Sequence, residues 1–352
     1  MAGPDKPNGQ HARLFIIHSQ LSAHNLSSPP HPTSPPLALI AQDMVAVDRV
    51  IGAKLSTGVP LVGQMCEYII SAGGKRLRPA LLLLMSGALG HGHANRHTLA
   101  AVVEFIHTAT LLHDDVVDES TLRRGRDTAN ERFGNAASVL VGDFLYSRAF
   151  QMMVEVGHMR VMEVLAEATN VIAEGEVQQL VNMRDAGLTE DNYLQVIRSK
   201  TAKLFEASAR LAAIVSDQSA EIEMACATYG QALGTAFQVI DDVLDYEGSA
   251  GSLGKNLGDD LREGKVTLPM IHALRNTTGP ERELLVNAIE NASEAHLDKV
   301  LELIRQTGAI NASRAAAWQE AQRAIDALAV LPETPHKSAL IELAASLQGR
   351  ES

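Results

Sequence analysis

The sequence of 352 residues contains little cysteine, few aromatic residues and no long apolar run. Its two cysteines, Cys66 and Cys226, are too few for a disulfide framework and are typical of a reducing compartment, so we expect a cytoplasmic protein. No apolar run approaches the roughly 20 residues that a membrane-spanning helix requires. The 42 acidic residues outnumber the 30 basic ones, and the resulting net charge of −12 argues against nucleic acid as a partner.

Proline is scarce in most of the chain but abundant at its beginning. Seven of the 13 prolines lie in the first 36 residues, and none lies between Pro79 and Pro269. We therefore predict a disordered tail rich in Pro, Ser and His over residues 1–36, or a misplaced start codon, and one domain over residues 37–352. The long proline-free stretch, rich in good helix formers, favours helices over strands.

The apolar residues follow a helical spacing. Residues 99–112 repeat apolar positions at three and four residues and are apolar almost all round, as expected of a helix in the middle of a large bundle. No alternation of strands and helices is visible. The sequence predicts an all-α bundle of ten or more helices around a central active-site cavity. Further helices are expected over residues 136–156, 161–179, 190–215, 221–246, 266–275 and 281–306.

Two clusters of aspartates follow apolar helical segments. Each has the pattern DDxxD, and residues i and i+4 share one face of a helix, so like charges lie close together and need a compensating cation. Clustered carboxylates without His or Cys are the ligands that Mg²⁺ prefers. The sequence therefore predicts Mg²⁺ binding at six aspartates: Asp114, Asp115 and Asp118 in the first cluster, and Asp241, Asp242 and Asp245 in the second.

A simpler interpretation of one such cluster is a solvated acidic face or the end of a helix. Two clusters in one chain, each directly after a strongly apolar segment, make this interpretation much weaker. A transition-metal site is disfavoured because neither cluster includes a histidine.

Basic residues accompany both clusters. The segment GGKRLRP contributes Lys75 and Arg78 beside glycines whose backbone amides are accessible, which is a pattern suited to a diphosphate. His107 lies two helical turns before Asp114 and on roughly the same face. A lone histidine on an apolar helix is usually a core residue, but the neighbouring acidic and basic groups favour a role in the site. We interpret His113 as structural and Trp318 as a core residue.

Together these motifs resemble the trans-isoprenyl diphosphate synthases, also called polyprenyl synthetases. The resemblance covers roughly residues 38–348, and it is greatest to the long-chain branch that makes eight-unit products for the ubiquinone side chain. It rests on GGKRLRP, EFIHTATLLHDDVVDESTLRRG, the Lys200–Thr201 pair, GTAFQVIDDVLDY and LGKNLGDDLREGKVTLP.

The resemblance implies a homodimer that uses two or three Mg²⁺ ions. It also implies head-to-tail addition of isopentenyl diphosphate to an allylic diphosphate such as farnesyl diphosphate. By motif, isopentenyl diphosphate would be held by Lys75, Arg78, His107 and Arg124. The allylic diphosphate would be held by Asp114, Asp118 and Asp241 through Mg²⁺, and by Arg123, Lys200 and Lys255. Thr201 and Gln238 would face the reacting carbons.

Product length should depend on the residues that precede the first aspartate cluster on its helix. Ala109 and Thr110, which lie five and four residues before Asp114, are both small, so a deep apolar pocket and a long product are expected. Met153 and Leu165 are candidates for the floor of this pocket.

Several alternatives remain open. A solanesyl or decaprenyl product is the nearest one. A terpene cyclase is disfavoured because the second cluster is a full DDxxD and GGKRLRP would lack a role. A non-catalytic subunit of a heteromeric prenyl synthase would be expected to have lost aspartates or basic groups that this chain retains.

Overall fold

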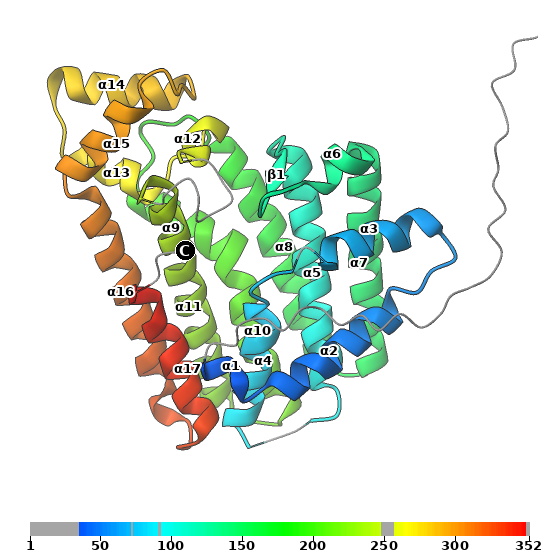
Figure 1. Ribbon diagram of the computed structural model, residues 1–352. Helices are drawn as coiled ribbons and strands as arrows, with labels where there is room; N and C mark the ends of the chain where they lie inside the picture. Colours follow the sequence, from blue (N-terminus) through cyan, green and yellow to red (C-terminus); the bar gives the residue numbers. More distant parts are fainter. Residues whose placement is uncertain (1–34, 72, 91–92, 248–256, 350–352) are drawn as a thin grey trace, which may run out of the picture. The chain divides into compact units, whose positions relative to one another are not determined.

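The computed structural model describes residues 35–71, 73–90, 93–247 and 257–349, which belong to one compact unit. Helices make up most of these residues (Figure 1), so the predicted all-α class is confirmed. The only sheet in the described ranges is a small hairpin of β1 (Leu122–Arg123) and β2 (Arg126–Asp127). A first short helix already begins at Pro35, whereas the remainder of the predicted tail lies outside the described residues.

The first half of the domain carries the helices that lead to the first aspartate cluster and away from it. The longest of them, α5, α7 and α8, are amphipathic or apolar segments, and α5 packs against both α4 and α7. Their bounds are α1 (Pro35–Ala38), α2 (Ala41–Lys54), α3 (Pro60–Ser71), α4 (Leu77–Ala88), α5 (Arg96–Val117), α6 (Ala129–Phe133), α7 (Asn135–Val156) and α8 (Met159–Val181).

The second half contains the longest helix, which carries the second cluster. Proline in the first turn begins α13, α14 and α17, where its missing N–H costs no helical hydrogen bond. The bounds are α9 (Glu190–Ile197), η1 (Arg198–Ala202), α10 (Lys203–Val215), α11 (Ala220–Glu247), α12 (Asp259–Glu263), α13 (Leu268–Arg275), α14 (Gly279–Glu290), α15 (Leu297–Gln306), α16 (Ala309–Ala327), η2 (Leu328–Val330), α17 (Pro335–Ala345) and η3 (Ser346–Gly349).

Two predicted helices differ from the structure. The segment predicted as one helix over residues 190–215 contains a π-helical turn, η1, between α9 and α10. The segment predicted over residues 281–306 forms two helices, α14 and α15, separated by the turn after Glu290. The other predicted helices are present with small shifts at their ends, where sequence patterns are least informative.

The buried apolar residues form two core clusters, and α11 contributes to both. One contains residues of α4, α5, α7, α8 and α10 together with the first half of α11. The other contains residues of α9 and α12–α16 together with the second half of α11. The aspartates of α5 adjoin the first of these two core clusters, and those of α11 adjoin the second. A polar site therefore lies where the apolar core divides.

Two glycines bring helices into direct backbone contact beside this site. A methyl group on Gly175 of α8 would lie 2.8 Å from the backbone nitrogen of Lys200, and one on Gly234 of α11 would lie 2.7 Å from Cα of Ala202. Both distances are shorter than any side chain tolerates. The π-helical turn is therefore held between α8 and α11 at positions that require glycine.

Three side chains outside the motifs can now be placed. His113 has its Nε2 3.2 Å from the carbonyl oxygen of Val139 and its ring stacked on Tyr146, in agreement with a structural role. Both cysteines are free and buried. Trp318 was predicted to be a core residue, but it lies on α16 with 50% of its surface exposed. That prediction was wrong because α16 buries a narrow stripe of alanines that excludes this position.

Candidate active site

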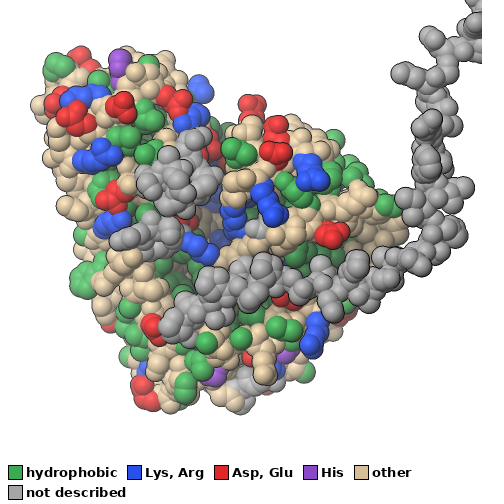
Figure 2. Space-filling view, viewed as in Figure 1, with side chains coloured by type: hydrophobic (Ala, Val, Ile, Leu, Met, Phe, Trp, Pro, Cys, Tyr) green, Lys and Arg blue, Asp and Glu red, His purple; other side chains and the backbone are tan. Residues whose placement is uncertain are grey.

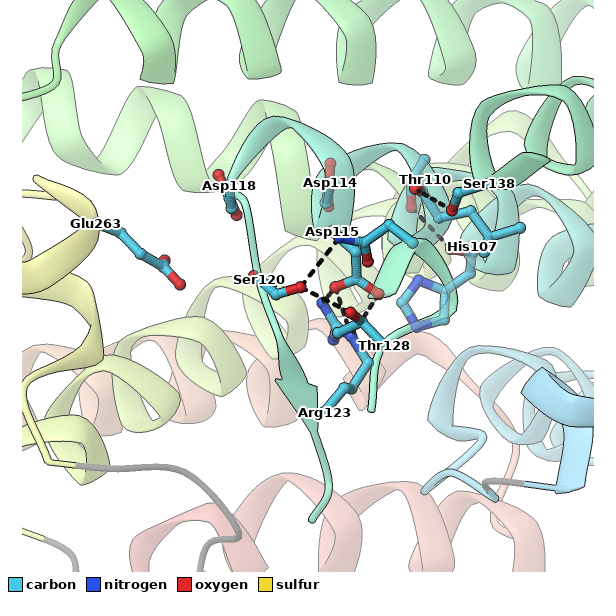
Figure 3. Close-up of polar contacts among 12 residues, drawn as sticks. His107, Thr110, Asp114, Asp115, Asp118, Ser120, Arg123, Thr128, Ser138 and Glu263 are labelled. Carbon is cyan, nitrogen blue, oxygen red and sulfur yellow. Dashed lines mark hydrogen bonds and ion pairs between the residues drawn. The ribbon is translucent and has the colours of Figure 1, made fainter. Parts of the chain in front are cut away.

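The first aspartate cluster lies at the C-terminal end of α5. Asp114 is in the last turn, and Asp118 is the C-cap residue, with its backbone N–H donated to the carbonyl of Asp114. The two carboxylates point to the same side of the helix end, as the i, i+4 spacing predicted (Figure 3). This arrangement gathers negative charge at a helix terminus that the helix dipole already makes negative, so the cluster requires cations from elsewhere.

Asp115, the middle aspartate, points to the opposite side (Figure 3). Its Oδ1 accepts hydrogen bonds from Nε and Nη2 of Arg123 at 2.9 and 2.7 Å, and Nε also lies 3.3 Å from Oδ2. The carboxylate is almost fully buried in this pair. Asp115 therefore fixes the hairpin that carries Arg123 and Arg124, and its predicted role as a Mg²⁺ ligand stays a prediction.

Two lysines from distant segments reach the outer aspartates. Lys200, on the π-helical turn, places its Nζ 3.8 Å from Oδ2 of Asp114 and 2.6 Å from Oε2 of Glu176 on α8. Lys265 places its Nζ 2.7 Å from Oδ2 of Asp118 and 2.6 Å from Oε2 of Glu263. Lys265 follows the second cluster in the sequence, but in the structure it contacts the first.

The charges around the first cluster do not cancel. Burial raises the pKa of Asp114, and the nearby Asp118 raises it further, although Lys200 opposes both effects. Burial and the charge of Asp114 likewise raise the pKa of Glu176 to about 7. Burial lowers the pKa of Lys265, but Glu263 and Asp118 outweigh it and the net pKa is raised. The two lysines thus offset only part of the cost of burying ionised carboxylates at this cluster.

The donor set fits Mg²⁺. All of the nearby acidic donors are carboxylates, and Mg²⁺ binds one or two carboxylates while retaining waters or phosphate oxygens as its other ligands. Within the described ranges, no three His, Cys, Asp or Glu side chains converge closely enough to enclose an ion without such additional ligands. The arrangement therefore suits a metal shared with a bound diphosphate better than a permanently enclosed metal.

The second cluster lies on α11 and differs in its surroundings. Asp242 is buried, and its carboxylate accepts hydrogen bonds from the hydroxyl of Tyr193 at 2.5 Å and from Nε2 of Gln238 at 2.7 Å. Burial raises the pKa of Asp242 well above its usual value, and the nearby Asp260 adds to the effect. Asp245 accepts the backbone N–H of Asp260 at 3.2 Å. Asp242 and Asp245 thus have different hydrogen-bond partners within one motif.

The side chains of Thr201 and Gln238 contact each other, and their role in facing the reacting carbons stays a prediction. Oγ1 of Thr201 donates a hydrogen bond to Oε1 of Gln238 at 2.9 Å. Thr201 belongs to the π-helical turn and Gln238 to α11, so the close packing at Gly234 brings the two side chains together. The structure therefore joins two predicted residues that are separated by 37 positions in the chain.

The predicted basic residues lie mainly on α4 and the hairpin. An Nη atom of Arg78 is 3.0 Å from Nε2 of His107, and the Arg78 guanidinium lies over the ring of Phe205. Burial, together with Arg78 and two other arginines, lowers the pKa of His107 well below its usual value, so the ring is neutral and can accept this hydrogen bond. Burial lowers the pKa of Arg78 to about 10, which leaves it charged at neutral pH.

Arg124 donates to the carbonyl oxygen of Gly73, which links the hairpin to the GGKRLRP segment. Lys75 is exposed in the same segment. Figure 2 shows Lys and Arg side chains gathered around a hollow on one face. Lys255, the remaining predicted basic residue, lies outside the described residues.

The residues predicted to set product length are fully or partly buried. Ala109, Met153 and Leu165 are fully buried and belong to the same core cluster, on α5, α7 and α8. Thr110 is partly buried, and its hydroxyl donates to the carbonyl oxygen of His107 at 2.8 Å. Their role in product length stays a prediction.

Sequence reasoning missed three residues of this site. Tyr193, Glu176 and Lys265 each contact a predicted residue, but none lies in an aspartate motif or adjoins one directly. For Lys265 a signal was present in the GK pair after Asp259 and Asp260. For Tyr193 and Glu176 no local signal existed, because their contacts are made across helices.

Comparisons with known proteins agree with this geometry. The family model for polyprenyl synthetase matches residues 59–306. The octaprenyl diphosphate synthase of Escherichia coli (strain K12) is 53% identical over 308 residues, which are 87% of this chain and 95% of that protein. No helix in the described residues is both long and apolar enough to cross a membrane.

Two solved structures are also similar. A decaprenyl diphosphate synthase from Rhodobacter capsulatus superposes with a TM-score of 0.86 and 45% identity, covering 90% of this chain and 98% of that one. A polyprenyl synthase from Caulobacter crescentus, complexed with calcium and isoprenyl diphosphate, superposes with a TM-score of 0.87 and 43% identity, covering 90% and 97%. With two aspartate clusters, the basic residues beside them and a matching family model over most of its length, the chain belongs to the polyprenyl synthetase family.

Proposed function

We propose that this protein is a long-chain trans-polyprenyl diphosphate synthase, and specifically an octaprenyl diphosphate synthase that supplies the ubiquinone side chain. It would extend farnesyl diphosphate with isopentenyl diphosphate units. The observation that carries the proposal is the arrangement of Asp114 and Asp118 beside Lys200 and Lys265, next to the Thr201–Gln238 pair. The 53% identity to the octaprenyl diphosphate synthase of E. coli supports the product assignment.

The allylic diphosphate would bind between the two aspartate clusters. Asp114, Asp118 and Asp241 would hold two or three Mg²⁺ ions, which supply Lewis-acid stabilisation of the departing diphosphate. Lys200, Arg123 and Lys255 would add fixed positive charge. The burial of Asp114 supports this assignment, because burial raises the pKa of this carboxyl group, Asp118 raises it further, and a bound cation would favour the ionised form.

Isopentenyl diphosphate would bind at the basic residues of the GGKRLRP segment and the hairpin. Lys75, Arg78 and Arg124 would bind its diphosphate, and neutral His107 would orient Arg78 through their 3.0 Å contact. Because Arg78 is buried against Phe205, its charge is poorly screened, which strengthens its attraction for an anion.

The reaction follows from this placement. The C–O bond of the allylic diphosphate breaks, and the bonding electrons leave with the diphosphate. The double bond of isopentenyl diphosphate then attacks the allylic carbon and forms the new C–C bond, which positioning of the two substrates favours. Loss of a proton, with the released diphosphate as the acceptor, regenerates an allylic diphosphate for the next cycle. Thr201 and Gln238 would stabilise the cation through their dipoles.

Product length would be set by the apolar residues below Asp114. Ala109 is fully buried in the core cluster that also contains Met153 and Leu165. Replacing Ala109 with Phe should shorten the product to about the farnesyl to geranylgeranyl range, because the ring would fill the space that a growing chain needs. The nearly isosteric Ala109→Ser is the control and should retain long products. An unchanged product length in Ala109→Phe would refute the role of this position.

We further infer a homodimer and a cytoplasmic location. Large apolar side chains are exposed along α7 and α8, among them Leu140, Val154, Met159, Val177 and Val181, and such a surface supports pairing with a second copy. The two free, buried cysteines support a reducing compartment. Analytical ultracentrifugation of the purified chain tests the dimer.

The central experiment is mass analysis of the products formed from labelled isopentenyl diphosphate, farnesyl diphosphate and Mg²⁺ by this chain alone. An eight-unit product supports the proposal. A nine- or ten-unit product would move the assignment to a solanesyl or decaprenyl synthase. No condensation by the isolated chain would favour a non-catalytic subunit and overturn the proposal.

A further inference from the structure

A hydrogen-bonded series of four side chains links the two elements that carry Thr201 and Gln238. It begins at Tyr193 on α9, passes through Asp242 and Gln238 on α11, and ends at Thr201 on the π-helical turn. The three distances along it are 2.5, 2.7 and 2.9 Å. Tyr193 and Asp242 are buried, so solvent does not compete for these hydrogen bonds.

The chemistry of the donors and acceptors gives the series a direction. An ionised carboxylate can only accept, so both the Tyr193 hydroxyl and the Gln238 amide must donate to Asp242. With its NH₂ group committed to Asp242, Gln238 presents Oε1 to Thr201. The Thr201 hydroxyl then directs its proton to Gln238. A proton bound at Oδ2 of Asp242 leaves Oδ1 as the acceptor, so the orientation of the amide is the same in either protonation state.

The direction of these hydrogen bonds determines whether Gln238 and Thr201 present oxygen or hydrogen atoms to a bound substrate. One proton of the Gln238 amide and the proton of the Thr201 hydroxyl are turned toward protein partners, and lone pairs on both oxygens are left for other contacts. An allylic cation is stabilised by the negative end of a dipole and destabilised by the positive end. An unconstrained glutamine or threonine could rotate and present N–H or O–H to the cation instead.

We propose that Tyr193 is a positioning residue that, through Asp242, orients Gln238 and Thr201 with their oxygen atoms toward the allylic cation. In this arrangement Asp242 serves orientation, and Asp241 and Asp245 are left as the metal-binding members of the second cluster. The inference rests on the proposed condensation reaction and adds a residue that lies outside every recognised motif.

The test compares Tyr193→Phe with Tyr229→Phe. Both tyrosines are fully or almost fully buried, and the Tyr229 hydroxyl donates only to the backbone carbonyl of Leu340 at 2.7 Å, so the control removes an equivalent hydrogen bond away from the series. Tyr193→Phe should lower kcat by about 10- to 100-fold, because orientation of the stabilising dipoles is lost. KM for both diphosphates and the Mg²⁺ concentration for half-maximal rate should change less than about twofold. Tyr229→Phe should leave kcat unchanged.

Each outcome distinguishes this inference from the proposed function. If wild type and Tyr229→Phe are active and Tyr193→Phe is equally active, the inference is overturned while the function stands. A raised Mg²⁺ requirement in Tyr193→Phe would also overturn it, because Asp242 would then act through the metal. If even wild type fails to condense, the proposed function fails.

A readout independent of turnover completes the test. In glutamine-labelled protein, the Gln238 side-chain amide can be assigned by its absence from Gln238→Glu. Its protons should exchange slowly with solvent in wild type and in Tyr229→Phe, and much faster in Tyr193→Phe. Equal protection in all three proteins would overturn the positioning role whether or not the enzyme is active.

Discussion

The two aspartate clusters have nearly the same sequence but different environments. In the first, DDVVD, the second aspartate, Asp115, is paired with the charged Arg123, and lysines contact the outer aspartates. In the second, DDVLD, the second aspartate, Asp242, accepts hydrogen bonds from the neutral donors Tyr193 and Gln238. The motif therefore determines where carboxylates are placed, whereas residues outside the motif determine what each carboxylate contacts.

The comparison assigns different roles to the outer and middle aspartates, and substitution at the first cluster tests this most strongly. Asp114→Asn should lower kcat by about a thousandfold or more, because it removes a charge that holds the metal. Asp115→Asn should lower kcat by only about tenfold, since Asn can still accept one hydrogen bond from Arg123. Steady-state rates at saturating Mg²⁺ measure both. Similar losses in the two variants would mean that both residues act as ligands.

Lysine contacts distinguish the first cluster from the second, and Lys265→Met tests their importance. The loss of the ammonium group on Asp118 should raise KM for the allylic diphosphate by about tenfold, because a charge-assisted contact in a poorly solvated site is lost. Lys203→Met is the control, since Lys203 forms ion pairs of 2.8 and 2.9 Å with Glu167 and Glu206. A KM equal to that of the control would show that Lys265 contributes nothing specific to the site.

The smallest predicted effect is a change of stability with pH, caused by Glu176 beside the first aspartate cluster. The pKa of Glu176 is raised to about 7, so between about pH 4.5 and pH 7 the folded state holds a proton that the unfolded chain has released. As pH rises through this interval in the absence of metal, wild type should lose roughly 1–3 kcal/mol of stability relative to Glu176→Gln. Denaturant unfolding at several pH values measures the difference.

Glu167→Gln provides a control of opposite sign. The pKa of Glu167 is lowered by Lys203, so wild type should gain stability relative to this variant as pH rises through the acidic range. If the stability of wild type relative to Glu176→Gln does not change with pH, the raised pKa of Glu176 and the charge inferred from it at the first cluster are contradicted.

Much of the fold could be predicted from the sequence because its signals are local. Helical periodicity and the absence of proline predicted the all-α class, and the i, i+4 spacing predicted that Asp114 and Asp118 share a face. The division of residues 281–306 into two helices was missed because the turn after Glu290 lacks proline and glycine. The π-helical turn was missed because its cause lies in the packing of α8 and α11 on either side.

The site could be predicted only where its residues fall in motifs. Lys200, Thr201 and Gln238 were found by resemblance, and their contacts follow from helix packing. Tyr193 and Glu176 could not be found because a tyrosine or a glutamate in a helix carries no signal of the partner it will meet. The different roles of Asp115 and Asp242 were also invisible, since both follow an aspartate in the same pattern.

The π-helical turn at Arg198–Ala202 makes the site depend on the number of residues as well as on their identity. A π turn accommodates one residue more than an α turn of the same height. Deleting one residue there would convert the π turn into a regular α turn and leave the helical segments on either side in register, so the change would fall on the directions of the residues within the turn. The lengths of α9 and α10 would be almost unchanged, yet Lys200 and Thr201 could not both retain their present directions. Insertions and deletions in this turn are therefore constrained even where substitutions are tolerated.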